Sequence, residues 1–199
     1  LFRSEGKTTV YDEKEGTRYQ VERNISQELQ NMHTLCDFAE NQLNILLSSE
    51  PQTISMEDVL RIMEFVSSQQ TESGSSYAIE WLDGAKLHIR KPATETYSMG
   101  LRTRENWFEV EGDLPLDEQT ILSAAELLRL MQEGMVGKRF IRLNETEFIA
   151  LNEHLAKQLS RVQQLSQINR NNVIIPRLEI GLLGELLSRP DTILQIGRA

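Results

Sequence analysis

The chain has 199 residues, a formal net charge of −9 and a sequence pI near 5.0. Hydrophobic residues make up 39% of it and charged residues 26%, a balance that is typical of a folded domain and excludes an intrinsically disordered chain. The length allows one sizeable domain or two small ones. Because the average charge repels phosphate, any contact with nucleic acid would need a local basic patch.

Hydropathy and cysteine content exclude further classes. The longest apolar stretches, such as Ile121 to Met131, are broken by polar residues and are far shorter than the about 20 residues that span a membrane. Cys36 is the only cysteine, which excludes an internal disulfide and Cys-rich metal frameworks, and we expect a reducing, cytoplasmic compartment. Neither end carries a targeting signal, so we expect both to be cuts in a longer polypeptide.

The first 70 residues predict a β-hairpin followed by two helices. Two β-prone runs between residues 7 and 23 flank a charged turn that ends in Gly16. From Ser26, an N-cap candidate, apolar residues recur every three or four positions to Leu46 or Leu47, which predicts a helix of about six turns. Ser55, with Asp58 three residues later, resembles a capping box that opens the second helix.

Residues 69–76 are polar and read as a loop or linker, so we expect one subdomain over 1–70 and a second over 71–199. Beyond it, residues 77–81 and 86–90 alternate apolar and polar around Asp83-Gly84, which predicts a second hairpin. Strand candidates at 97–102 and 107–110 extend it to a four-stranded antiparallel β-meander.

The remaining sequence predicts helices and one more hairpin. A helix begins at Asp117 or Thr120 and ends at Gly134, a hairpin turns at residues 144–146, and Asn152 caps the next helix. Pro176 would open a last helix through Leu187. The predicted fold class is therefore α+β: a hairpin with a helical pair, then an antiparallel meander with packed helices and a further hairpin.

No catalytic, cofactor-binding or metal site can be assembled from these residues. The segment 134–139 comes nearest to a phosphate-binding loop, but it lacks the spacing and precedes a strand. His33, His88 and His154 lie in three different elements, without the spacing of zinc ligands. A serine nucleophile on a glycine-flanked turn is also missing. We expect that this chain is not an enzyme and holds no cofactor.

Basic residues near the strand ends are the candidate functional residues. If those ends converge, they could contact a phosphate backbone; the alternative is that they are simply solvated. Trp81 and Trp107 fit a core better than a base-stacking platform. The candidate DNA contacts are Arg90, Lys91, Arg102, Arg104, Lys138, Arg139 and Arg142.

Two stretches carry a family resemblance. Asn106 to Glu118 reads Asn-Trp-Phe-Glu-Val-Glu-Gly-Asp-Leu-Pro-Leu-Asp-Glu, and after a Leu-rich helix Gly137 to Leu151 reads Gly-Lys-Arg-Phe-Ile-Arg-Leu-Asn-Glu-Thr-Glu-Phe-Ile-Ala-Leu. Together they resemble the region N-terminal to the ATPase core of bacterial SWI/SNF-type helicases of superfamily two, over about residues 77 to 187. The departure is Asn144-Glu145-Thr146, which stands where an Asp-Gly turn is usual.

The resemblance implies that the whole protein is an ATP-dependent DNA translocase or helicase. Its motor would follow in the same polypeptide and bind ATP and magnesium, and this segment would be a regulator, a scaffold or a guide for DNA. Two other functions are weighed against it: a protein-interaction adaptor whose acidic surface recruits a basic partner, and a small hydrolase with an unfamiliar site.

Overall fold

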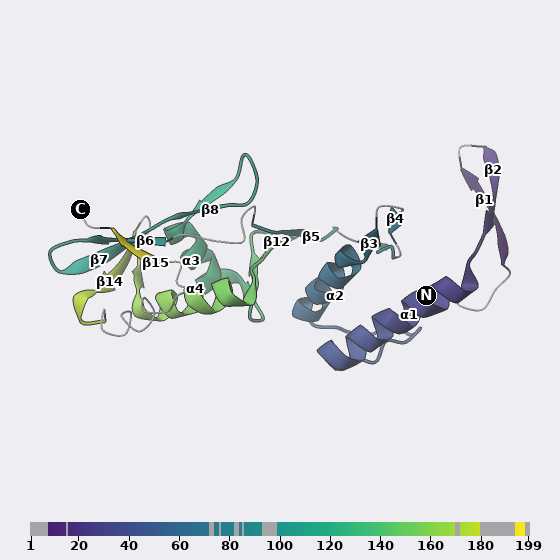
Figure 1. Cartoon of the computed structure of the whole chain (residues 1–199), viewed down its shortest axis with the longest axis horizontal. Helices are drawn as coiled ribbons and strands as arrows, with labels where there is room; N and C mark the ends of the chain where they lie inside the picture. The colour runs from purple at the N-terminus through teal and green to yellow at the C-terminus, as the bar shows by residue number, and fades with distance from the viewer. Residues whose placement is uncertain are drawn as a thin grey trace. The chain divides into compact units, whose positions relative to one another are not determined.

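The chain divides into two compact units, residues 1–80 and 81–199, in this computed structural model. The structure describes residues 8–14, 16–71, 74–75, 77–81, 84, 86–92, 99–169, 172–179 and 194–197. Helices and antiparallel sheets with hairpins occur in separate runs along the chain, which confirms the predicted α+β class (Figure 1).

The first unit opens with the predicted β-hairpin. Strands β1 (Thr9–Lys14) and β2 (Thr17–Glu22) pair antiparallel, with Val10 opposite Val21. Gly16, in the connection, has a φ of 77°, a left-handed conformation that glycine adopts without steric cost. The turn chemistry of the sequence therefore placed this hairpin correctly.

Two helices follow the hairpin, as predicted. Helix α1 (Ile25–Phe38) continues into a π-helical turn, η1 (Ala39–Leu43), and the chain leaves it at Asn44, whose φ is 57°. The N-cap is Asn24 and not Ser26: the Asn24 side chain accepts the Gln27 N–H at 3.1 Å. The left-handed Asn44 ends the helix before the predicted Leu46 or Leu47.

Helix α2 (Met56–Ser68) begins where the capping box predicts. The Ser55 hydroxyl accepts the Asp58 backbone N–H at 3.2 Å, which supplies one of the partners that a helix start lacks. The polar segment after α2, predicted to be only a loop, contains the two-residue strands β3 (Gln70–Thr71) and β4 (Gly74–Ser75), paired antiparallel.

The second unit contains two larger sheets. The four-stranded sheet has the order β10-β11-β12-β5. Its strands are β10 (Met135–Val136), β11 (Phe140–Arg142), β12 (Glu147–Ala150) and β5 (His88–Arg90). The five-stranded sheet has the order β13-β14-β7-β6-β15. Its strands are β13 (Gln167–Ile168), β14 (Val173–Pro176), β7 (Trp107–Glu111), β6 (Met99–Thr103) and β15 (Leu194–Gly197).

Strand pairing is antiparallel at most positions, but β15 pairs in parallel with β6 and β5 does not take its predicted partner. Residues 77–81 are not a strand, and β5 pairs in parallel with β12, with Glu147 opposite His88. The predicted hairpin around Asp83-Gly84 is therefore wrong, although β6 and β7 pair antiparallel as predicted. Strand β5 pairs with β12, which is distant in the sequence, and not with the neighbouring residues 77–81. In the resulting sheet β11 and β12 are the two inner strands.

The segment before the central helix also differs from the prediction. Strands β8 (Asp113–Pro115) and β9 (Ile121–Ser123) form a small antiparallel hairpin, and helix α3 (Ala124–Gly134) begins only after Ser123. The Asp117 carboxylate accepts the backbone N–H groups of Gln119 and Thr120 at 2.8 and 2.7 Å. Asp117 therefore holds a turn and does not open a helix.

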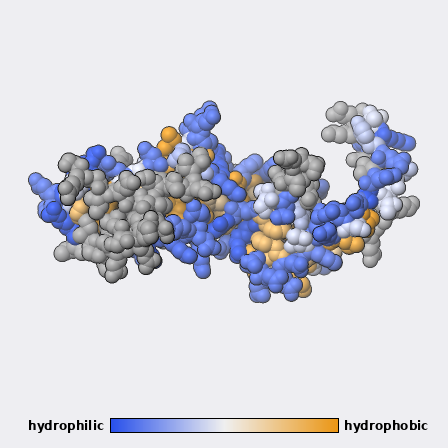
Figure 2. Space-filling view, viewed as in Figure 1, coloured by the Kyte–Doolittle hydropathy of each residue, from blue (hydrophilic) through white to orange (hydrophobic). Residues whose placement is uncertain are grey.

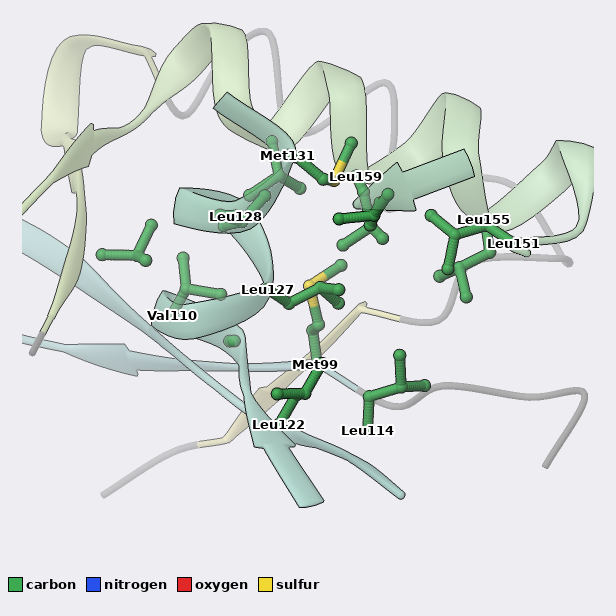
Figure 3. Close-up of a cluster of buried hydrophobic side chains, with 14 of the residues drawn as sticks. Met99, Val110, Leu114, Leu122, Leu127, Leu128, Met131, Leu151, Leu155 and Leu159 are labelled. Atoms are coloured by element: carbon green, nitrogen blue, oxygen red, sulfur yellow. The ribbon is translucent and has the colours of Figure 1, made fainter. Parts of the chain in front are cut away.

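One hydrophobic core joins both sheets to the two helices (Figure 3). Helix α3 and helix α4 (Glu153–Leu165) present Leu127 and Leu159, both fully buried, to this core. The two sheets add residues such as Met99 and Ile149, also at 0% exposure. Each fully buried side chain of this size contributes about 1.5–3 kcal/mol of hydrophobic free energy.

The last two predicted helix starts have different outcomes. The Asn152 side chain accepts the Leu155 N–H at 2.7 Å, so the predicted cap is confirmed. Pro176 does not open a helix: it is the last residue of β14, opposite Trp107, and is followed by a 3₁₀ turn, η2 (Arg177–Glu179). The rest of the predicted last helix, 180–187, lies outside the described residues.

Candidate functional site

The structure places the seven basic candidate residues around two different sheets of the second unit. Two lie in or beside the five-stranded sheet: Arg102 and Arg104. Five lie in or beside the four-stranded sheet: Arg90, Lys91, Lys138, Arg139 and Arg142.

Carboxylates of the neighbouring strand meet both arginines of the five-stranded sheet. Arg102 pairs with Glu111 at 3.0 Å, and Arg104 with Glu109 at 2.7 Å. All four side chains lie on the face turned away from the buried Leu101 and Val110, because residues alternate between the faces of a strand. These four side chains carry two positive and two negative charges, so their charges balance and a phosphate backbone would have to displace the glutamates.

Arg90 is the centre of an ion-pair network between three segments. Its guanidinium contacts Glu147 of β12 at 2.7 Å and Asp117 of the β8–β9 turn at 2.8 Å. The hydrogen bond from Arg90, together with one from Asn144, holds the pKa of Glu147 below its usual value. The pKa of Asp117 is also lowered, chiefly by the backbone N–H of Gln119. The network fastens β5 to the rest of the unit.

Three of the other basic residues gather at one end of the four-stranded sheet. Because Ile149 lies opposite Arg90 and Ala150 opposite Phe140, Lys91 falls level with the start of β11, about 10 Å away across β12. Lys138 and Arg139 immediately precede β11, so the end of the sheet carries Lys91, Lys138 and Arg139. Lys91 and Lys138 are exposed.

Arg139 and Arg142 each lie over an aromatic ring of the hairpin that they flank. The Arg139 guanidinium carbon is 5.1 Å from the centre of the Phe140 ring, and that of Arg142 is 5.7 Å from the Phe148 ring. Both distances fit cation–π contacts. Three of the seven candidates thus lie at the same end of one sheet, and the other four make separate local contacts. Their contact with DNA stays a prediction.

The tryptophans correct one expectation. Trp107 is 40% exposed on the outer face of β7, and Trp81 is half-buried, so neither belongs to the central core. Trp107 points outward because Phe108 and Val110 take the two inward positions of the same strand.

A different surface, on the helical pair of the first unit, was not predicted. The two helices stack Phe38 on Phe65, with ring centroids 4.3 Å apart, and Tyr77 closes the group by packing on Phe65 and donating its hydroxyl to the Asn31 carbonyl at 2.8 Å. Burial raises the pKa of Tyr77. These contacts tie Tyr77 to the helices and place the division of the chain after residue 80, beyond the predicted boundary at 70.

Most apolar residues of this helical pair stay partly exposed. Among the described residues of the first unit only three apolar side chains are buried: Ala39, Leu60 and Val66. Many more on the same helices are half-buried: Leu29, Met32, Leu35, Leu43, Val59, Ile62 and Met63. Leu46, in the connection after η1, and Met56, the first residue of α2, are 76% and 37% exposed. Figure 2 shows apolar residues gathered over this pair.

We call this surface the apolar surface of the helical pair, and define it by Leu46, Met56, Ile62 and Met63. It lies within an acidic stretch: residues 24–80 contain nine acidic residues and a single basic one, Arg61. The heptad-like spacing of apolar residues predicts the helices, but it cannot reveal that two helices alone leave their facing stripes half-covered.

Among the described residues, no three His, Cys, Asp or Glu side chains lie close enough together to hold a metal ion. No helix in the described part of the chain has the length and hydropathy to cross a membrane.

Comparison with known proteins returns no family model, no curated protein and no solved structure that matches the chain.

Proposed function

We propose that this chain is a non-catalytic accessory segment of a SWI/SNF-type, ATP-dependent helicase, and that it supports the motor by protein contact through the helical pair. The observation that carries the proposal is the apolar surface of the helical pair, where Leu46 and Met56 are exposed and Ile62 and Met63 are half-buried. Exposed apolar patches on a folded unit mark places where another surface packs. The resemblance of residues 77–187 supplies the helicase motor as the partner.

The charge arrangement supports protein contact over the guiding of DNA. Arg90, Arg102 and Arg104 already have carboxylate partners. The basic residues that gather at one end of the four-stranded sheet, Lys91, Lys138 and Arg139, form a small group, whereas contacts to phosphate normally involve many such residues. The acidic stretch around the apolar surface would repel the DNA that the motor grips, and so keeps this surface for protein.

The proposal is tested by DNA-stimulated ATP hydrolysis of the longer polypeptide. The double substitution Leu46→Lys with Met56→Lys charges the apolar surface at exposed positions, where the cost to folding is small. We expect the ATPase rate to change several-fold because the motor loses its support. Ile121→Lys, at a position 60% exposed in the second unit, is the matched control and should leave the rate unchanged.

Equal rates in the double variant and in the wild-type protein would contradict the proposal. If the chain is instead an adaptor, the double substitution should leave ATP hydrolysis unchanged, because an adaptor binds a separate basic protein and has no ATPase partner in its own polypeptide. A role as a guide for DNA is tested by titrating labelled duplex DNA with the chain at low and moderate salt and measuring fluorescence anisotropy. Salt-sensitive binding that is lost in Lys91→Glu with Lys138→Glu would favour that role.

A further inference from the structure

The N-terminal hairpin exposes residues that a stable sheet usually covers. Tyr11 is 72% exposed, Tyr19 50% and Val10 42%. Among the described strands, β1 and β2 pair only with each other (Figure 1). A two-stranded hairpin is marginally stable in water, and its edges are open to another strand.

Backbone hydrogen bonds identify the groups available on the outer edge of β2. The Arg23 N–H donates to the Thr8 carbonyl at 2.7 Å, so Thr8 and Arg23 form a hydrogen-bonded pair. Hydrogen-bonded and non-bonded pairs alternate along an antiparallel ladder. By this alternation, the backbone N–H and C=O groups of Arg18, Gln20 and Glu22 point away from β1.

We propose that the outer edge of β2 pairs with β2 of a second copy of this chain, antiparallel, about a two-fold axis at Gln20. This register uses the outward backbone groups of all three residues and makes a four-stranded sheet in the order β1-β2-β2-β1. Such an isologous contact is the commonest way in which proteins form homodimers. The inference is independent of the proposed function and goes beyond it.

Charge complementarity singles out this register and this partner. With Gln20 opposite its own copy, Arg18 lies opposite Glu22 of the second chain, and the symmetry makes this pair twice. Arg18 also lies 3.5 Å from Glu13 within its own hairpin, an exposed ion pair, so the Glu22 carboxylate of the second chain would be a second partner for the same guanidinium. Within one chain, Glu22 lies opposite the uncharged Thr9, so its carboxylate has no charged neighbour directly across β1.

The other edge of the hairpin lacks this self-complementarity. The outward backbone groups of β1 belong to Thr9, Tyr11 and Glu13, by the same alternation. A two-fold axis at Tyr11 sets Thr9 opposite Glu13 and pairs no opposite charges. The β2 edge is therefore the one that fits a second copy.

Sedimentation of the full chain over a range of concentrations at low salt tests the proposal. The wild-type chain should pass from monomer to dimer as its concentration rises. Glu22→Arg sets like charges opposite each other twice in the dimer, and should weaken it about tenfold or more. Glu50→Arg, which makes the same change of charge at an exposed position outside the hairpin, should sediment like wild type.

Mixing two charge variants supplies the decisive arm. Glu22→Arg chains and Arg18→Glu chains each repel their own copies, but together they restore opposite charges at both positions of a heterodimer, so the mixture should dimerise. The proposal is overturned by a wild-type chain that stays monomeric, by Glu22→Arg behaving like wild type, by Glu50→Arg weakening the dimer equally, or by a mixture that fails to associate.

Discussion

Gly134 ends α3 at the point where the helix lies against β11. A Cβ atom added to Gly134 would stand 3.1 Å from the Arg142 carbonyl oxygen and 3.3 Å from the Arg142 Cβ, both closer than ordinary contact. The glycine therefore allows the helix and the sheet to approach, in addition to ending the helix.

We predict that Gly134→Ala lowers the free energy of unfolding by about 1–3 kcal/mol, as overpacking in a core does. Gly100→Ala is the matched control, since the nearest atom to its added Cβ, the Glu111 carbonyl oxygen, is 3.9 Å away. Urea denaturation followed by tryptophan fluorescence measures both. Equal stability of the two variants would show that α3 can shift away from β11 at no cost.

Residues with local roles could be predicted from the sequence. Ser55 and Asn152 cap their helices with their own side chains, and Asn144 makes the turn that replaces the usual Asp-Gly. The Asn144 side-chain oxygen accepts the backbone N–H groups of Thr146 and Glu147, each at 2.9 Å. These interactions span three residues or fewer, so the sequence contains their whole signal.

At the scale of elements, no local sequence signal identifies the partners of β5. Its pairing with β12 joins residues 59 positions apart, such as His88 and Glu147, and the two Arg90 contacts join residues 27 and 57 positions apart. Arg90 looks the same in the sequence whether it faces phosphate or carboxylate, and so the sequence alone suggested DNA. Ile121 and Leu122 misled in another way, because three residues of β9 are too few to distinguish alternation from helical spacing.

The Arg90 network predicts a loss of stability in acid. The pKa values of Glu147 and Asp117 are lowered in the folded chain, so the carboxylates stabilise it at neutral pH, and this contribution disappears as the pH falls through the folded pKa values. The difference in Tm between wild type and Arg90→Met should therefore be largest near pH 7 and shrink as the pH falls from about 5 toward 2.

Thermal unfolding across this pH range, followed by circular dichroism, measures the difference. Arg142→Met is the control, since it removes one arginine whose described contact is the Phe148 ring and should show a constant difference. A gap between wild type and Arg90→Met that is equally large at pH 3 and pH 7 would mean that the network does not stabilise the fold through its charges.

At the scale of the whole molecule, the α+β class and the existence of two units follow from the sequence, and the position of the boundary does not. The segment 77–81 has the alternation of a strand, but Tyr77 is held by Phe65 and Asn31, far away in the sequence. Tertiary contact decides such a segment against its local preference. The spacing of apolar residues likewise predicts α1 and α2 but cannot predict that their apolar faces stay partly exposed.

This boundary predicts that the two units respond separately to a change at Tyr77. Tyr77→Ala should destabilise the helical pair by about 1–3 kcal/mol, through loss of an aromatic contact and a hydrogen bond, and Tyr77→Phe by about 1 kcal/mol. With Trp81 replaced by Phe in both proteins, Trp107 of the second unit is the single tryptophan, so the fluorescence reports that unit and its urea midpoint should not move. If the Trp107 midpoint falls together with the helical signal, the units do not unfold separately.

The central claim, that the chain works by protein contact through its helical pair, is tested most directly by backbone hydrogen exchange of the chain alone and mixed with the expected helicase motor. The claim predicts that the motor slows exchange in α1, η1 and α2 and in the residues that follow them, with the effect lost in Leu46→Lys with Met56→Lys. Unchanged exchange in these helices, or slowing confined to the segment around Lys91, Lys138 and Arg139, would contradict it.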